Sequence, residues 1–280
     1  MAVIKSKVLG FCEGGRASIE GVLELAKDGS KVYVYGKLLH NKNAIKDLEE
    51  KGIIFLEPKP GVKVEGKLAI RAHGVTDCIK AQLCEKNQVV DLTCPKVLKI
   101  NWITKMYEKK GFHIVYLGKA KHPEVDGTLG NLKNYTLIHS LEGAQKIQQD
   151  KVAFVAQSTA NLETFREIAD YFAEHKPQAI VVDTICWSTR KRQEEAESLA
   201  KKVDIMVIIG GKDSANTAEL VATCKKFVPS IWVEKPEEIK KNLAELKKIK
   251  NIGLTAGAST PDEDIDKLYE ILKAVDSGSA

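Results

Sequence analysis

Three cysteines share one spacing along this chain. Cys12, Cys94 and Cys186 each close a short, strand-like apolar run, and a helical pattern follows each of them. A second apolar run then ends in a glycine, and that glycine lies 24 residues after the cysteine in all three cases. The glycines are Gly36, Gly118 and Gly210. Repetition at a fixed period predicts a chain built from similar supersecondary units.

Small polar loops repeat with the same register. After each glycine come a lysine and a polar cluster, and a third apolar run in each unit ends in a further polar loop. The first set of loops contains Lys37 with His40-Asn41, Lys119 with His122 and Glu124, and Lys212 with Ser214 and Asn216. The second set is Ala72-His-Gly74, Ala156-Gln-Ser-Thr159 and Ala256-Gly-Ala-Ser-Thr260. Each unit therefore offers one cysteine and two polar loops.

Short apolar runs alternate with helical patterns throughout, which predicts an α/β fold with parallel sheets. The clearest strands are expected at 31–35, 114–117, 152–156, 180–182 and 205–209, with a helix at 43–52. We expect three similar α/β units, 12–93, 94–185 and 186–280, in a pseudo-threefold, three-lobed arrangement around a central site. Residues 1–11 are expected to pack as a strand near that centre.

Composition excludes several classes of protein. The net charge is only +5 and the basic residues are scattered, whereas a nucleic-acid binder concentrates them in a block or stripe. No apolar run approaches the roughly 20 residues that span a bilayer, and the first ten residues do not resemble a signal peptide. A cytoplasmic location is expected, where cysteines are ligands or buried small residues rather than disulfide partners.

Three cysteines that converge on one centre suit a metal site with an open coordination position. Zinc held by three sulfurs and a four-iron cluster with three cysteine ligands both fit, and three buried structural cysteines are the alternative. No Cys-x-x-Cys pair is present, which counts against a zinc ribbon and a ferredoxin-type electron carrier. Cys78, Cys84 and Cys224 lie outside the repeat, and we expect all three to be buried small residues.

The polar loops suit a phosphate or diphosphate, because strand ends and helix starts supply hydrogen-bond donors. The candidate ligands are His40, Asn41, His73, His122, Ser158, Thr159, Ser214, Asn216 and Ser259. The other histidines are expected to be structural (His113) or on the surface (His139 and His175). Glu124 is the acidic group placed beside a histidine, so it is either a proton donor in the site or a surface residue after a proline turn.

The loop sequences resemble one enzyme family over essentially the whole chain. The matching segments are Gly10-Phe-Cys12, His40-Asn41, Ala72-His-Gly-Val75, Thr93-Cys-Pro95, His122-Pro-Glu124, Gln157-Ser-Thr159, Ile185-Cys186, Ser214-Ala-Asn216 and Thr255-Ala-Gly-Ala-Ser259. They occur in the order typical of 4-hydroxy-3-methylbut-2-enyl diphosphate reductases, the last enzymes of the non-mevalonate isoprenoid pathway.

The resemblance implies an iron–sulfur oxidoreductase. Cys12, Cys94 and Cys186 would hold a central [4Fe–4S] cluster whose fourth iron binds the allylic oxygen of the substrate. The substrate-binding residues would be His40, His73, His122, Ser158, Thr159, Ser214, Ala215, Asn216 and Ser259, with Glu124 as the catalytic acid. Two electrons from reduced ferredoxin or flavodoxin and two protons would remove the hydroxyl as water, giving isopentenyl and dimethylallyl diphosphate. No nucleic acid or membrane partner is implied.

The chain departs from the family pattern at a few positions. Glu13 and Gly15 change the run after the first cysteine, Ala215 replaces a frequent serine, and Ser158 replaces a frequent threonine. Two other classes use some of the same residues. A zinc enzyme would use the three cysteines, whereas a non-catalytic iron–sulfur sensor would give the phosphate loops and Glu124 no purpose.

Overall fold

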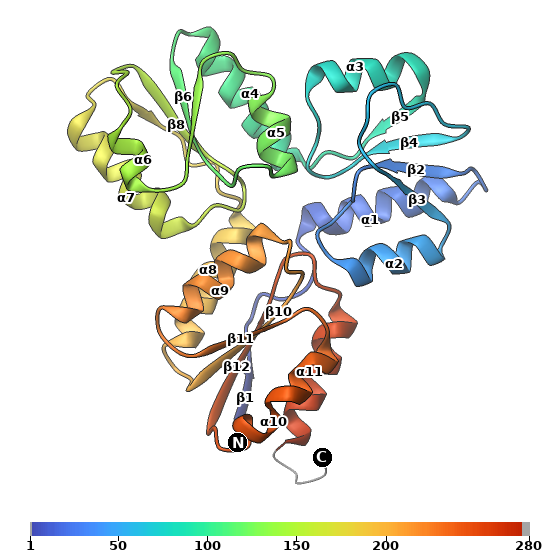
Figure 1. Cartoon of the computed structure of the whole chain (residues 1–280), viewed down its shortest axis with the longest axis vertical. Helices are drawn as coiled ribbons and strands as arrows, with labels where there is room; N and C mark the ends of the chain where they lie inside the picture. The colour runs from blue at the N-terminus through green and yellow to red at the C-terminus, as the bar shows by residue number, and fades with distance from the viewer. Residues whose placement is uncertain (1, 276–280) are drawn as a thin grey trace. The chain divides into compact units, whose positions relative to one another are not determined.

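The computed structural model describes residues 2–275 and contains three four-stranded sheets in which all strand pairs are parallel (Figure 1). The first sheet has the order β3 (Ile53–Leu56), β2 (Val32–Tyr35), β4 (Lys67–Ile70) and β5 (Gln88–Asp91). The second has β7 (Tyr135–Ile138), β6 (His113–Leu117), β8 (Val152–Ala156) and β9 (Ile180–Val181). The third has β11 (Ser230–Val233), β10 (Ile205–Ile209), β12 (Asn251–Ala256) and β1 (Ala2–Lys5).

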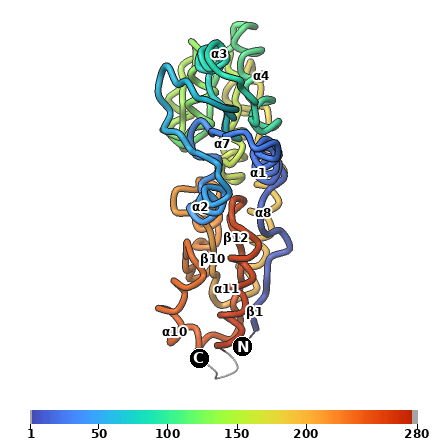
Figure 2. Tube along the Cα trace, turned by 90° about the vertical axis from the view of Figure 1, so that its right-hand side faces the viewer, coloured from blue at the N-terminus to red at the C-terminus, as the bar shows by residue number. Residues whose placement is uncertain are grey.

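All three sheets share one topology, so the expected α/β class with three similar units is confirmed. In each sheet the strand that comes first along the repeat lies between the second and the third, and the fourth lies at the far edge. In the third sheet this fourth strand comes from the other end of the chain. β1 pairs with β12, with Ala2 opposite Asn251, and lies beside it in Figure 2.

Helices connect most successive strands, as is usual for parallel pairing, and the exception is the segment 57–66 between β3 and β4. In chain order they are α1 (Glu13–Ala26), α2 (Lys42–Glu50), α3 (Asp77–Lys86), α4 (Pro95–Lys109), α5 (Pro123–Leu129), α6 (Leu141–Gln145), α7 (Leu162–His175), α8 (Trp187–Ala200), α9 (Ala215–Lys225), the 3₁₀ helix η1 (Pro236–Asn242), α10 (Leu243–Leu246) and α11 (Asp262–Ala274). No helix within residues 2–275 is long and apolar enough to cross a membrane.

The chain divides into two compact bodies, the first unit and the second unit, and these two units are distinct from the three α/β repeats of the sequence. The first unit comprises Met1–Glu13, Leu39–Asp47 and Trp187–Ala280 and contains the third sheet. The second unit comprises Gly14–Leu38 and Leu48–Cys186 and contains the first and second sheets. The division into 12–93, 94–185 and 186–280 stays a prediction, as does the central packing of residues 1–11.

Each sheet is buried on both faces where its central strands run. β6, β8 and β10 are buried at every residue, which explains why their sequences are almost continuously apolar. Phe154 of β8 stacks on Phe165 of α7 on one face of the second sheet, while Tyr116 of β6 belongs to a separate apolar cluster. These rigid central strands fix the loops at their carboxyl ends.

Sequence patterns placed the central strands well and the edges less well. The strands at 152–156 and 205–209 are confirmed to the residue. Three of the six edge strands, β3, β7 and β11, were not predicted, since their residues are only partly buried and show weak alternation.

The cysteines do not close strands, contrary to expectation. β5 ends at Asp91, and the Asp91 carboxylate then accepts hydrogen bonds from both the N–H and the hydroxyl of Thr93. Such side-chain turns replace the ladder bonds of a continuing strand. The N-terminal strand ends at Lys5, and Gly10 has a φ of 70°, so the run that leads into Cys12 is also not a strand.

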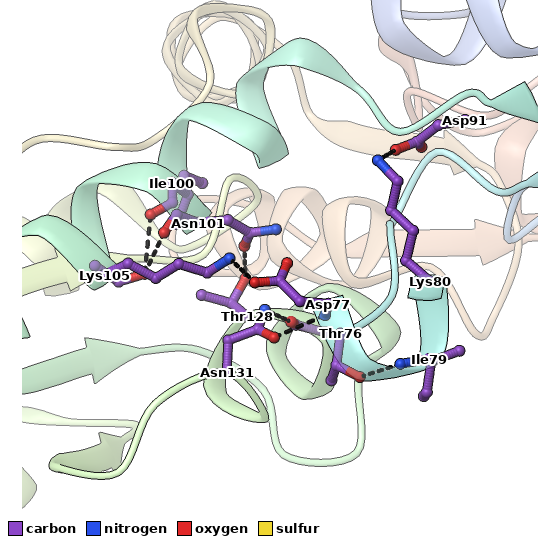
Figure 3. Close-up of polar contacts among 12 residues, drawn as sticks. Thr76, Asp77, Ile79, Lys80, Asp91, Ile100, Asn101, Lys105, Thr128 and Asn131 are labelled. Atoms are coloured by element: carbon purple, nitrogen blue, oxygen red, sulfur yellow. Dashed lines mark hydrogen bonds and ion pairs between the residues drawn. The ribbon is translucent and has the colours of Figure 1, made fainter. Parts of the chain in front are cut away.

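In the second unit, the first and second sheets are joined by polar contacts around the start of α3 (Figure 3). The N–H of Asp77 donates to the side-chain oxygen of Asn131 over 2.8 Å, and the Asp77 carboxylate pairs with Lys105 of α4. Thr76 caps α3 by accepting from the N–H of Ile79. These contacts hold α3 against the layer that contains α4 and α5.

Candidate functional site

The three repeat cysteines are seated in the same way. Each lies one residue before a helix, α1, α4 or α8, and is partly buried. The N–H of each donates to a carbonyl two residues beyond the third strand of a sheet: Cys12 to Ala258, Cys94 to Ala72 and Cys186 to Ser158, over 3.0, 2.9 and 2.9 Å. The helix N-terminus favours negative charge, which suits a thiolate ligand.

Close packing around two of these cysteines involves residues that sequence reasoning did not single out. A side chain at Gly14 would meet the Cys94 sulfur, since a Cβ there would lie 2.6 Å from it. Arg192 of α8 is 2% exposed and donates to the carbonyls of Val8 and Gly10, just before Cys12. α8 also buries Thr189 and Gln193, so no apolar pattern in the sequence marked Arg192 as a buried residue.

The cysteines outside the repeat differ from one another. Cys224 is buried as predicted, and burial raises the pKa of its thiol to about 12. The prediction that Cys78 and Cys84 are buried is wrong, because both are exposed. α3 buries only Leu83, so the rest of its residues, including both cysteines, lie nearer the surface.

Glu124 lies in the first turn of α5 and is 2% exposed, which excludes the surface interpretation. Its two carboxylate oxygens accept hydrogen bonds from the N–H and the hydroxyl of Ser158, over 2.7 and 2.6 Å. Burial raises the pKa of the Glu124 carboxyl above its ordinary value of 4.5, and the bonds from Ser158 oppose this rise. A raised pKa keeps a carboxylic acid protonated at a higher pH, as a general acid needs.

A continuous series of contacts joins Glu124 to two cysteines within the second unit. The Ser158 carbonyl accepts from the N–H of Cys186, and the Glu124 N–H donates to Nδ1 of His122 over 3.2 Å. The His122 ring meets the edge of the His73 ring at 5.4 Å between centroids. His73 in turn follows Ala72, whose carbonyl holds the N–H of Cys94.

The protonation of His122 follows from this contact. Because Nδ1 accepts a hydrogen bond, a neutral His122 carries its proton on Nε2, which makes that atom a donor.

Thr159 follows Ser158, and its hydroxyl is buried without a hydrogen-bond partner among the described residues. The second unit therefore brings together His73, His122, Glu124, Ser158 and Thr159 of the predicted site residues.

The first unit brings together the remaining predicted residues. The loop after β10 supplies Ser214, Ala215 and Asn216, all buried at the start of α9. The loop after β12 supplies Ser259, whose hydroxyl lies 3.5 Å from the carbonyl oxygen of His40. His40 is half-buried, and the side-chain oxygen of Asn41 accepts from the N–H of Ala44 at the start of α2.

Several buried polar atoms of the first unit have no hydrogen-bond partner among residues 2–275. Both side-chain amide atoms of Asn216 and the amide nitrogen of Asn41 have none among the described residues. Buried polar atoms are normally hydrogen-bonded, so such a group of atoms indicates that a polar ligand belongs there. Ser214 uses its hydroxyl oxygen to cap α9 by accepting from the N–H of Thr217.

Glycines bring the loops of the first unit close to one another. A Cβ at Gly211 would lie 2.1 Å from the His40 carbonyl oxygen, and one at Gly257 would lie 2.1 Å from the Thr217 hydroxyl. Thr217 is fully buried, and its hydroxyl lacks a partner among residues 2–275, yet sequence reasoning did not select it. Its position directly after Asn216 was the only signal.

Comparison with known proteins identifies relatives over nearly the whole chain. A relative from Clostridioides difficile (strain 630), named 4-hydroxy-3-methylbut-2-enyl diphosphate reductase, is 38% identical over 96% of this chain and 98% of its own. A relative of the same name from a Nitratiruptor species is 36% identical over 98% of this chain and 99% of its own.

Solved structures give the same result. The E-1-hydroxy-2-methyl-but-2-enyl-4-diphosphate reductase from Plasmodium falciparum matches with a TM-score of 0.88 and 26% identity, covering 96% of this chain and 87% of its own. A second structure, of (E)-4-hydroxy-3-methyl-but-2-enyl diphosphate reductase, matches with a TM-score of 0.68 and 32% identity, covering 98% and 100%. The family described as LytB protein matches residues 3–273, and the chain belongs to this family.

Proposed function

We propose that the chain is an oxidoreductase that converts (E)-4-hydroxy-3-methylbut-2-enyl diphosphate to isopentenyl and dimethylallyl diphosphate. The C–O bond to the allylic hydroxyl breaks, two electrons and two protons enter, and water leaves. The identical seating of Cys12, Cys94 and Cys186 carries this proposal, because three equivalent thiols before three helices suit one shared metal centre. The names of the relatives supply the substrate.

The three cysteines would hold a [4Fe–4S] cluster. Such a cluster, with three protein ligands, supplies electrons and an open iron that acts as a Lewis acid. The residues fit this group, since all three thiols lie at helix starts and Gly14 leaves room at the Cys94 sulfur only because it has no side chain. Cluster ligation needs reduced thiols, so we place the protein in the cytoplasm.

The diphosphate would be bound by polar residues of the predicted site, namely His40, His73, His122, Ser214, Asn216 and Ser259. The buried amide of Asn216, without a partner of its own among the described residues, supports this role. Ala215 can offer only its backbone, so the serine hydroxyl that is frequent at this position is absent here.

Glu124 would deliver protons through Ser158. Both oxygens of its carboxyl group accept hydrogen bonds from Ser158, so the orientation of the group is set before the substrate binds. To deliver a proton, the protonated Glu124 carboxyl would donate to the Ser158 hydroxyl oxygen while Ser158 gives its own hydroxyl proton to the departing hydroxyl, since a hydroxyl group can accept and donate at once. Thr159, beside it, would contact the hydroxyl end of the substrate.

The electrons would come from reduced ferredoxin or flavodoxin. Each such protein gives one electron at a time, so two deliveries complete one turnover. The sequence has no G-x-G-x-x-G dinucleotide fingerprint and no P-loop, so no motif points to a nicotinamide donor, and this choice of donor rests on the family resemblance.

Anaerobic purification tests the proposal. We expect about four irons and four sulfides per chain, and turnover of the allylic diphosphate with a chemical reductant such as dithionite-reduced methyl viologen. Zinc in place of iron, or a full cluster without turnover of this substrate, would contradict it. The first result would favour the zinc enzyme and the second the iron–sulfur sensor.

A further inference from the structure

Helix α4 carries two large apolar side chains on its exposed face. Leu98 is 46% exposed and Trp102 is 64% exposed, and they lie one helical turn apart. Both line a groove of about 420 Å³ that also includes Met106. Leu98 and Trp102 form an apolar pair at this groove, and tryptophan is enriched among the residues that contribute most of the binding free energy at protein interfaces.

The same helix begins at a proposed cluster ligand. Cys94 is the residue before α4, and its carbonyl accepts a hydrogen bond from the N–H of Leu98 over 3.0 Å. With a rise of 1.5 Å per residue, Trp102 lies about 12 Å from Cys94 along the helix axis. A protein bound at this face would therefore sit at the outer end of a short, continuous path to the cysteine.

Lysines surround the apolar pair. α4 contains four lysines and one acidic residue, Glu108, whose carboxylate accepts from the N–H groups of Lys133 and Asn134. Lys105 pairs with Asp77 (Figure 3), whereas Lys99 and Lys109 are exposed and have no ion-pair partner in the described part of the chain. The face thus combines an apolar centre with positive charge that is not neutralised.

We propose that the α4 face, formed by Leu98, Trp102, Lys99 and Lys109, docks the acidic one-electron donor protein. This inference rests on the proposed function and adds where the donor binds. Acidic groups on the donor would meet Lys99 and Lys109 and steer its approach, and Trp102 would anchor the contact. Each docking event delivers one electron towards Cys94, so the donor must bind twice in each turnover.

Charge favours this occupant over a second copy of the chain. In a symmetric dimer the same patch would face itself, and the lysines of both copies would meet. Like charges placed together at an interface disfavour binding. An acidic partner neutralises these lysines instead.

The test compares two electron sources on the same holoenzyme. Two variants are assayed: the single variant Trp102→Ala and the double variant that combines Lys99→Glu and Lys109→Glu. Each is assayed with a reduced acidic plant-type ferredoxin and, separately, with reduced methyl viologen. We expect the KM for ferredoxin to rise about tenfold in each variant and turnover with methyl viologen to stay near that of the wild type. The charge-reversal variant should also lose most of the salt dependence of the ferredoxin reaction.

Matched controls lie elsewhere on the surface. Phe227→Ala removes another exposed aromatic side chain, and Lys247→Glu reverses an exposed lysine of the first unit. Both should leave the KM for ferredoxin unchanged. Trp187→Ala tests the competing exposed tryptophan beside Cys186.

Three results would overturn the docking proposal. The first is an unchanged KM for ferredoxin in both α4 variants. The second is a KM for ferredoxin that rises in Trp187→Ala and in no other variant. The third is a change in the oligomeric state of Trp102→Ala, measured by sedimentation, with no change in ferredoxin kinetics. A wild type that has a cluster but no turnover with methyl viologen contradicts the proposed function itself, which separates the two failures.

Discussion

Both carboxylate oxygens of Glu124 in the second unit accept hydrogen bonds from Ser158, whereas neither amide atom of Asn216 in the first unit has a partner among the described residues. Both side chains are at least 95% buried. The second unit thus fixes its titratable group before any ligand arrives, and the first leaves donors and acceptors unsatisfied. A proton donor needs a fixed position and a tuned pKa, whereas a binding loop needs unused hydrogen-bonding atoms.

Cysteine replacement should have the largest effect, because the proposed cluster supplies the electrons for every turnover. Serine at Cys12, Cys94 or Cys186 should remove most of the iron and nearly all turnover, since a serine is a far poorer ligand for iron than a thiolate. Iron and sulfide analysis with a turnover assay measures this. Serine at the exposed Cys78 or Cys84 is the control and should keep the iron content. Loss of iron from these controls, with Cys12 dispensable, would reverse the assignment.

The next largest effect is expected at Glu124, whose two carboxylate oxygens both accept hydrogen bonds. Glu124→Gln keeps the size of the side chain but cannot give up a proton, so turnover should fall by about 10² to 10⁴-fold while the cluster and substrate affinity persist. Single-turnover spectroscopy under anaerobic conditions separates binding from chemistry. Near-normal turnover would make Glu124 a structural residue and move the acid to water or to the substrate diphosphate.

A smaller effect is expected in the polar loops of the first unit. Asn216→Ala and His40→Ala should raise the KM for substrate by about 10 to 100-fold with a modest change in kcat, because a hydrogen bond to a charged group contributes about 1.5–3 kcal/mol in ground and transition states alike. Calorimetric titration with inorganic diphosphate provides a check without turnover. If the substrate alcohol without its diphosphate binds as tightly as the diphosphate, the role of these loops is wrong.

The smallest effect concerns the pH dependence of stability. Burial raises the pKa of Glu124 in the folded chain, so the folded state holds this proton more tightly than the unfolded state does. Relative to Glu124→Gln, the wild type should be most stable below the ordinary carboxyl pKa of 4.5 and should lose stability as pH rises through the higher folded pKa. Thermal unfolding of both proteins across pH measures the difference. If the wild type instead gains stability relative to Glu124→Gln as pH rises, the hydrogen bonds from Ser158 outweigh the effect of burial and favour the ionised carboxylate.

Sequence reasoning succeeded where the signal is periodic. The 24-residue spacing predicted three similar units, and β8 and β10 lie where their buried apolar runs predicted them. It failed at Cys78 and Cys84, because an exposed and a buried cysteine on a helix of weak amphipathicity have the same sequence signature. It also missed the edge strands β3, β7 and β11, whose partly buried residues do not alternate clearly.

The sequence by itself determined the α/β class, the threefold repeat, the family and the polar loops after the strands, because each depends on local pattern or spacing. Only the tertiary structure decided that β1 completes the third sheet, that Ser158 binds Glu124 and that Arg192 holds the segment before Cys12. These contacts join residues 34 to 249 positions apart in the chain. Their partners are chosen by packing and by the need to satisfy buried polar groups, which no local pattern records.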